Sequence, residues 1–291
     1  MSLEVWNTIE QTRAAVAAAR ASRLSVGLVP TMGALHEGHA ALIREAAQRT
    51  GFVVVSVFVN PTQFGPNEDF DRYPRSLEAD CELAESAGAA GVFAPTVAEL
   101  YPRGGLSTAV DVLGLSECLE GPIRPGHFRG VATIVLKLLH IVSPDVAVFG
   151  EKDYQQLQIV RRMVADLDLA VEIAAVATVR EPDGLALSSR NRYLSPSQRV
   201  DARALWRALE AAIRSVRAGQ TSATRVRQTM LESLESVPGL ELDYAAIVDA
   251  ETLSPVEHLD RGRPARALVA ARIGSTRLID NAPLPLPTGS D

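Results

Sequence analysis

The chain has little cysteine, no excess of basic residues and no long apolar run, and each shortage excludes a class of protein. Its 291 residues include two cysteines, too few for a disulfide framework. Its net charge of −6 argues against a protein that coats nucleic acid or anionic membrane, since such proteins usually carry a basic excess. No apolar run approaches the ~20 residues of a membrane span. The N-terminal residues also lack the basic start and apolar core of a signal peptide. We therefore expect a cytoplasmic protein with no nucleic-acid or membrane partner.

Strand-like and helical segments alternate along residues 24–179. The predicted strands are short and apolar, and the near-continuous apolar run at 52–60 is typical of a strand buried on both faces. They lie at 24–30, 52–60, 91–95, 145–150 and 171–179, and helices are predicted between them at 39–51, 77–87, 131–143 and 154–167. This alternation implies βαβ units and a parallel sheet. We predict a Rossmann-like α/β domain over residues 1–179.

The pattern changes after Val179, where two amphipathic helices precede three strand-like segments. The sequence SPSQ at Ser195–Gln198 supplies an N-cap, a proline at the first helical position and a glutamine that closes a capping box. The predicted strands lie at 240–249, 265–274 and 276–281. We predict a smaller C-terminal α+β lid domain with an antiparallel sheet over residues 180–283, and a loose proline-rich tail over 284–291.

Polar, glycine-containing loops follow four of the predicted parallel strands. Their sequences are TMGALHEGH, NPTQFGPNEDFDRYPR, GEKDYQQ and REPDGLALSSRN. In an open parallel sheet, ligands bind beyond the carboxyl ends of the strands. Because such loops converge on one edge of one sheet, we predict a single ligand site there.

The first of these loops places His36 and His39 three residues apart, so they share a face if a helix begins near Glu37. The free N–H groups and positive dipole end of that helix favour an anion and disfavour imidazolium. Gly33 and Gly38 allow a ligand close to the backbone. A metal site is one alternative, although it needs further ligands and HEGH lacks the HExxH spacing. The other alternative is that neither histidine has a functional role. The glycine-rich strand-to-helix context favours phosphate.

Five segments carry a specific resemblance. TMGALHEGH resembles the HxGH signature of the nucleotidyltransferase superfamily, which alone is weak evidence. In series, VPTMGALHEGH, FVNPTQFGPNEDFDRYPR, GPIRPGHFRGV, FGEKDYQQL and REPDGLALSSRNRYLS resemble one family, the pantoate–β-alanine ligases or pantothenate synthetases. The resemblance covers about residues 25–195. Beyond about residue 200 only the general pattern of the sequence is similar.

The resemblance implies an ATP-dependent, Mg²⁺-assisted ligase. Its family adenylates the carboxylate of pantoate with loss of pyrophosphate, and the amine of β-alanine then attacks the acyl adenylate and expels AMP. The resemblance also implies a homodimer. A nucleotidyltransferase that acts on a phosphate acceptor and a nucleotide-binding regulatory module without turnover are the alternatives. The two glutamines and the SSRN loop favour the ligase over the nucleotidyltransferase. The presence of the histidine, lysine and serine/arginine sets together disfavours the regulatory module.

Position by position, the resemblance implies catalytic roles for His36, His39, Lys152 and Arg190. For His39 we favour electrostatic stabilisation over proton transfer, because of the helix dipole. The residues implied in ATP binding fall in three segments. They are Met32, Gly33, Ala34, Leu35, His36, Glu37, Gly38 and His39; Gly150, Glu151, Lys152 and Asp153; and Val179, Leu187, Ser188, Ser189 and Arg190.

The residues implied in binding pantoate and β-alanine include two amides, which both donate and accept hydrogen bonds and so suit a dihydroxy acid. They are Gln63, Gln156, Met32, Asn60 and Tyr73. Asp80 matches a magnesium-associated position, with a solvated helix residue as the alternative. The chain departs from the family pattern at Ala79, where an acid is expected in some members, and at Leu187, where methionine is common. The roles of His127 and Arg129, in the predicted loop 124–130, stay open.

Overall fold

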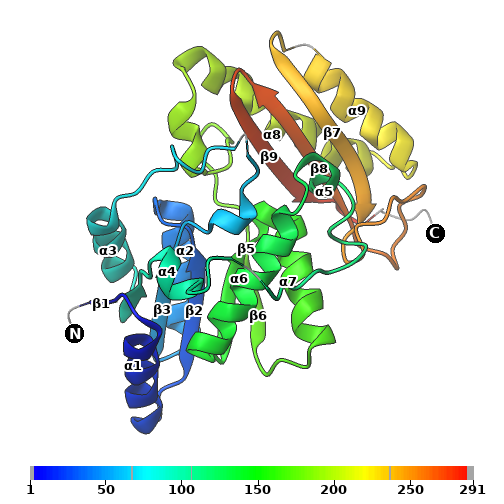
Figure 1. The fold of residues 1–291 in the computed structure, drawn as a ribbon. Helices are drawn as coiled ribbons and strands as arrows, with labels where there is room; N and C mark the ends of the chain where they lie inside the picture. The colour runs from blue at the N-terminus through cyan, green and yellow to red at the C-terminus, as the bar shows by residue number, and fades with distance from the viewer. Residues whose placement is uncertain (1–2, 67, 106, 236, 287–291) are drawn as a thin grey trace. The chain divides into compact units, whose positions relative to one another are not determined.

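The computed structural model describes residues 3–66, 68–105, 107–235 and 237–286 (Figure 1). The chain forms two compact units. The first comprises Met1–Glu151 and Gln155–Ala177, and the second comprises Lys152–Tyr154 and Thr178–Asp291. The second unit therefore includes the three-residue turn Lys152–Tyr154, which interrupts the first unit in sequence.

The first unit is built on a six-stranded sheet of order β1-β4-β3-β2-β5-β6, in which every pairing is parallel. The predicted parallel sheet is confirmed, and the valine-rich strand β3 is buried along four of its six residues, as a doubly covered strand requires. The strands are β1 (Glu4–Trp6), β2 (Val26–Thr31), β3 (Phe52–Val57), β4 (Gly91–Phe93), β5 (Val146–Gly150) and β6 (Glu172–Val176).

Helices cover both faces of this sheet, as right-handed crossovers demand. The helices α2 and α3 pack on one face, while α1 and α6 contact each other on the other face (Figure 1). Their bounds are α1 (Ile9–Ala21), α2 (Glu37–Arg49), α3 (Leu77–Ser86), α6 (His127–Val142) and α7 (Tyr154–Asp166), with short helices α4 (Val97–Leu100), α5 (Glu120–Ile123), η1 (Pro61–Gln63) and η2 (Glu151–Asp153).

Two features of the first unit differ from the sequence prediction. The segment containing β1 and α1 was not predicted, because β1 has three residues and α1 is rich in alanine with a weak apolar stripe. Helix α6 begins at His127 instead of Val131, so most of the predicted loop 124–130 is helical. Gly126, with a φ of 80°, allows the tight entry into this helix.

The strand order reverses between β2 and β5, because the chain proceeds from β2 to β3 on one side and from β5 to β6 on the other. A ligand site in an open α/β sheet is expected at such a switch point, beyond the carboxyl ends of the two strands. The segments that follow β2 and β5 begin with Met32 and Glu151, and both belong to the predicted ATP-binding loops.

The second unit packs two helices on a three-stranded antiparallel sheet of order β7-β8-β9. The predicted small sheet is confirmed, as is the capping box of Ser195 and Gln198 that starts α8. Leu205, Met230 and Val269 are in its core. The elements are η3 (Ser189–Tyr193), α8 (Pro196–Arg217), α9 (Ala223–Glu235), β7 (Leu240–Asp249), β8 (Ala265–Ile273) and β9 (Thr276–Pro283).

The packed chain continues slightly beyond the predicted boundary of the tail. Leu284 is buried in the core of the second unit, and its N–H donates to the carbonyl of Ala265. The remainder of the predicted tail from residue 287 lies outside the described residues. None of the helices formed by the described residues has the length and apolar character needed to cross a membrane.

Candidate functional site

The two histidines of the HEGH segment cap their own helix. His36 is the N-cap of α2, and its Nδ1 accepts a hydrogen bond from the N–H of Gly38 at 3.2 Å. His39 reaches back, and its Nδ1 accepts from the N–H of His36 at 3.3 Å. The helix begins at Glu37, two residues before the predicted segment 39–51, which is the start that the shared face of the two histidines required. Their ring centroids lie 4.1 Å apart.

This capping fixes the protonation of both rings. A ring nitrogen that accepts a backbone N–H carries no proton, so we assign each imidazole as neutral with its proton on Nε2. Each ring then presents an Nε2–H donor at the positive end of the helix dipole. Neutral donors in this position can bond to an anion without the cost of placing a cation at a helix N-terminus.

The loop between β2 and α2 is held by Asp80. Its Oδ2 accepts from the N–H of Ala34 at 3.0 Å and its Oδ1 accepts from the N–H of Leu35 at 2.7 Å. Gly33 and Ala34 have φ values of 84° and 51°, a backbone conformation in which alanine is strained. A Cβ on Gly33 would lie 2.9 Å from Asp80 Oδ2, so only glycine allows this approach.

Asp80 is 3% exposed, which contradicts the alternative interpretation of a solvated helix residue. It is not a solvated helix residue, because it lies against the loop that carries the histidines. Both of its oxygens accept backbone N–H groups, and its predicted association with magnesium stays a prediction. Among the described residues, His, Cys, Asp and Glu side chains form no group of three or more that would hold a metal ion.

Asn60, Gln63 and Met32, predicted to bind substrate, come together at the ends of β2 and β3. Gln63 Nε2 lies 2.8 Å from Met32 Sδ, and Gln63 Oε1 accepts from Asn60 Nδ2 at 3.2 Å. Asn60 is 1% exposed, and its Oδ1 accepts from the hydroxyl of Tyr101 at 2.8 Å. Asn60 therefore holds the side chain of Gln63, and its predicted contact with the substrate stays a prediction.

The main chain of Gln63 is supported by His127, at the start of α6. His127 Nδ1 lies 2.7 Å from the carbonyl oxygen of Gln63, which accepts, so we assign the proton to Nδ1. Its Nε2 then accepts from Arg124 Nη1 at 2.9 Å. Arg124 in turn forms a bidentate ion pair with Glu68 at 2.7 and 2.6 Å. Burial lowers the pKa of His127 to about 4, so the ring is neutral near pH 7.

Gly130 brings α6 against the same turn. A Cβ at this position would lie 2.3 Å from the carbonyl oxygen of Thr62, which no side chain tolerates. The sequence left the role of His127 open, because its support involves the pairing of Glu68 with Arg124, which are 56 residues apart. The sequence signal that could have indicated it was the glycine-rich RPGHFRG segment.

Tyr73 is also buried here and packs edge-on against Phe64, with ring centroids 6.0 Å apart. Gln156, a predicted pantoate ligand, is partly buried in α7.

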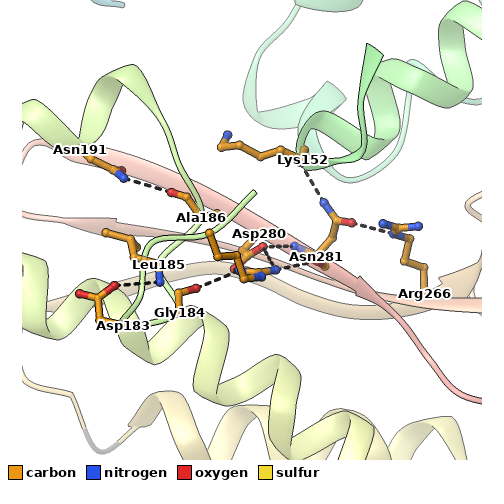
Figure 2. Close-up of polar contacts among 10 residues, drawn as sticks. Lys152, Asp183, Gly184, Leu185, Ala186, Asn191, Arg266, Asp280 and Asn281 are labelled. Atoms are coloured by element: carbon orange, nitrogen blue, oxygen red, sulfur yellow. Dashed lines mark hydrogen bonds and ion pairs between the residues drawn. The ribbon is translucent and has the colours of Figure 1, made fainter. Parts of the chain in front are cut away.

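The second unit contains the other predicted basic residues. Lys152 follows β5, which ends at Gly150, and lies with Glu151 and Asp153 in the turn η2. Its Nζ is 3.8 Å from Asp153 Oδ1, an ion pair whose side chains are 22% and 51% exposed. Figure 2 shows the Lys152 side chain extending away from Asn281, whose Nδ2 donates to the Lys152 carbonyl oxygen at 2.9 Å.

The segment from Val179 to Arg190 folds back on itself. The N–H of Leu187 donates to the carbonyl of Val179, which joins two of the predicted nucleotide contacts. Ser188 caps the turn η3, because its Oγ accepts from the N–H of Arg190 at 3.3 Å, and Ser189 is buried. Asn191 Nδ2 donates to the carbonyl of Ala186 at 3.0 Å (Figure 2). These contacts give the SSRN segment a defined shape.

Comparison with known proteins decides the family. The family model described as pantoate-beta-alanine ligase matches residues 4–283. This chain belongs to the pantoate–β-alanine ligase family. The pantothenate synthetase of Moorella thermoacetica is 55% identical over 282 residues, which cover 97% of this chain and 99% of that protein. That of Nocardioides sp. is 57% identical over 288 residues, covering 97% and 85%.

Solved structures agree with the family assignment. The crystal structure of pantothenate synthetase from Thermus thermophilus is 50% identical, has a TM-score of 0.92, and is matched over 97% of this chain and 100% of that one. The pantoate–β-alanine ligase of Francisella tularensis, solved in complex with β-γ ATP and β-alanine, is 34% identical, with a TM-score of 0.79 and 97% of each chain covered. The resemblance and the predicted fold class are confirmed.

Within the first unit, the structure groups the predicted family residues into two clusters. One is the loop from Met32 to His39, and the other is the pair Asn60 and Gln63, which Met32 joins to the first. Within the second unit, Lys152 and the segment 179–190 are both attached to β9, through Asn281 and Asp280. Sequence reasoning missed Asp280 and Asn281, because a polar pair at the end of a strand carries no motif.

Proposed function

We propose that this member of the family condenses pantoate with β-alanine at the expense of ATP. A pantoate carboxylate oxygen attacks the α-phosphorus, and the bond to the β-phosphate oxygen breaks to release pyrophosphate. The amine nitrogen of β-alanine then attacks the acyl carbon, loses a proton and displaces AMP. The first step requires two anions to be brought together and the phosphate charge to be neutralised in a preorganised site.

The observation that carries this proposal is the imidazole capping box at the start of α2. His36 and His39 are held by the backbone N–H groups of Gly38 and His36, so their Nε2–H donors are oriented before any ligand binds. Donors that need no reorganisation contribute most to stabilising charge that develops in a transition state. We assign both histidines to hydrogen bonding with phosphate oxygens, and neither to proton transfer.

Gln63 supports the assignment of the acid substrate. Its amide lies beside the thioether of Met32, so a polar group that donates and accepts adjoins a soft apolar one. Such a pair suits pantoate, which carries hydroxyl groups and a dimethyl carbon. We assign Gln63 and Gln156 to the hydroxyl and carboxylate groups of pantoate, and Tyr73 to the same substrate region.

The remaining family positions complete the proposal. We assign the ammonium of Lys152, the guanidinium of Arg190 and the hydroxyls of Ser188 and Ser189 to the phosphates, and Asp153 to the ribose. Magnesium would reach the site with ATP, held mainly by phosphate oxygens and water as is usual for nucleotide-bound Mg²⁺. Asp80 is assigned to holding the histidine loop, and no step of the reaction is routed through it.

The test is a reconstituted assay with ATP, Mg²⁺, pantoate and β-alanine, in which AMP and pyrophosphate are followed separately. The proposal predicts pyrophosphate release that requires pantoate and multiple-turnover AMP release that requires β-alanine as well. Turnover with a phosphate acceptor in place of pantoate would indicate a nucleotidyltransferase. ATP binding without turnover under every condition would indicate a regulatory module.

Two further family properties are part of the proposal. We propose that the chain is a homodimer, which sedimentation velocity over a range of protein concentrations will test; a concentration-independent monomer would contradict it. We also propose a cytoplasmic location, which cell fractionation will test.

A further inference from the structure

The turn Lys152–Tyr154 belongs to the second unit because three contacts attach it to the β7–β9 sheet. Asn281 Nδ2 donates to the carbonyl oxygen of Lys152 at 2.9 Å. The hydroxyl of Tyr154 donates to the carbonyl oxygen of Ala250 at 2.8 Å. The guanidinium of Arg266 lies 3.6 Å from the centroid of the Tyr154 ring. The contacts come from both β9 and β8, so the turn is fixed at more than one point.

Asn281 has an orientation that the chemistry of its neighbours dictates. Its Oδ1 accepts from Arg266 Nε at 2.6 Å, and arginine has only donors. The other end of the amide must therefore be Nδ2, which faces the carbonyl oxygen of Lys152 (Figure 2). Asn281 is 3% exposed, so these bonds form away from solvent. An amide is the group that fits, because it accepts at one end and donates at the other.

The preceding residue on β9 holds the loop that leads to the SSRN segment. Asp280 receives both terminal nitrogens of Arg180, at 2.6 and 2.9 Å, and the Arg180 side chain is 17% exposed. Arg180 also donates to the carbonyl of Gly184 at 3.1 Å and to that of Asn281 at 3.3 Å. Its guanidinium stacks 3.7 Å from the ring centroid of Trp206. Asp280 Oδ1 additionally accepts from the N–H of Asn281 at 2.7 Å.

From this arrangement we propose that Asn281 is a positioning residue for Lys152. Together with Asp280 it fixes the turn 152–154 and the loop 180–191 as one body, so that the Lys152 ammonium and the Ser188–Arg190 segment keep a set spacing. Asn281 acts on the main chain of Lys152, whose side chain extends away from Asn281 (Figure 2). The inference rests on the proposed function, in which both elements meet the phosphates of ATP.

The variant that tests this role is Asn281→Asp. A carboxylate of the same shape keeps the acceptor for Arg266 but has no donor for the carbonyl of Lys152, which it would repel. We expect a 10- to 100-fold fall in kcat for pantoate-dependent exchange of labelled pyrophosphate into ATP, with KM for pantoate changed less than about threefold. A misplacement of about 1 Å at a reacting group is enough for a loss of this size.

Measuring the variant in a Lys152→Ala background separates positioning from general damage. If Asn281 acts through Lys152, Asn281→Asp causes no further loss once the ammonium is gone, because the two changes are not additive. The matched control is Asp243→Asn, which removes the ion pair between Asp243 and Arg277 of β9, 2.7 Å long, without touching the turn. It should exchange pyrophosphate at the wild-type rate.

A second variant keeps the test decisive if Asn281→Asp does not fold. Tyr154→Phe retains the ring under Arg266 but removes the bond to Ala250, and a three- to fivefold fall in kcat is expected, again absent in the Lys152→Ala background. Wild-type kcat in the folded Asn281→Asp variant or, if that variant does not fold, in Tyr154→Phe would overturn the inference. So would a loss that multiplies with that of Lys152→Ala. Absence of exchange in the wild-type protein would instead overturn the proposed function, and the inference with it.

Discussion

The histidine pair of the first unit and Lys152 of the second unit are held in position in different ways. His36 and His39 are oriented by N–H groups of their own segment, at most three residues away. Lys152 has its main chain bonded to a side chain 129 residues away. The imidazoles are therefore specified by a local sequence pattern, whereas the position of the ammonium depends on the folding of a separate unit.

This difference bears on which changes the protein should tolerate. A local capping box forms wherever its helix forms, so the histidines need only α2 and the loop before it, which Asp80 of the same unit holds. Lys152 needs the intact β9 strand and the amide of Asn281. We expect the histidine donors to survive changes in the second unit, and the placement of Lys152 to be sensitive to them.

The largest expected effect comes from removing the groups themselves. His39→Ala and Lys152→Ala should each slow pyrophosphate exchange by at least ~10²-fold, as does the removal of one donor to a developing charge. His39→Ala also removes one half of the capping box, so it should lower the melting temperature, whereas Lys152→Ala should not. Near-normal exchange in both variants would contradict the assignment of the site.

The next effect comes from the residue that holds the histidine loop. Asp80→Asn places an amide donor against one of two backbone N–H groups, which should cost about 1–3 kcal/mol of stability and about tenfold in kcat. The Mg²⁺ concentration for half-maximal activity should stay unchanged, because Asp80 contacts the loop. The control is Glu78→Gln, an exposed carboxylate on the same helix. A marked shift in the Mg²⁺ requirement, with rescue by excess metal, would restore Asp80 as a metal ligand.

The third effect, which is on stability at acidic pH and not on kcat near neutral pH, concerns His127 and the support of Gln63. The folded state binds fewer protons than the unfolded state between pH 6.5 and about 4, because burial lowers the pKa of His127 to about 4. The stability that neutral His127 contributes is therefore fully present above pH 6.5, and it is lost as the pH falls toward 4. The loss amounts to about 3 kcal/mol at 1.36 kcal/mol per pKa unit.

His127→Asn isolates this effect, since it keeps a donor near the Nδ1 position and does not titrate. The difference in unfolding free energy between wild type and variant should shrink from pH 7 to pH 4 in denaturant titrations. A difference that stays constant over this range would show that His127 is not held neutral.

How much the sequence reveals follows the same division between local and distant contacts. Apolar periodicity and cap residues predicted the parallel sheet, a helix that matches α2 to within two residues at each end and the capping box of Ser195, because each depends on neighbours in the chain. The resemblance indicated which loops belong to the predicted ligand site. Neither could reveal that Asp80 bonds to the loop 45 to 46 residues before it, since the pairing depends on how α3 packs.

The position of Lys152 was similarly beyond sequence reasoning. GEKD identifies the loop after β5, but nothing in those letters connects it to DN at positions 280–281. The predicted boundary at residue 179 followed the change from alternating strands and helices to two consecutive helices. The transfer of Lys152–Tyr154 to the second unit depends on side-chain contacts with Asn281, Arg266 and Ala250, which no local pattern encodes.

The central claim is that a pantoate carboxylate oxygen attacks the α-phosphorus of ATP. Pantoate labelled with ¹⁸O in its carboxylate tests it most directly, with mass spectrometry of the products after complete turnover with β-alanine. The account predicts one labelled oxygen in AMP and none in pyrophosphate, because the acyl–oxygen bond breaks when the amine attacks. Unlabelled AMP, or label in phosphate released together with ADP, would contradict it.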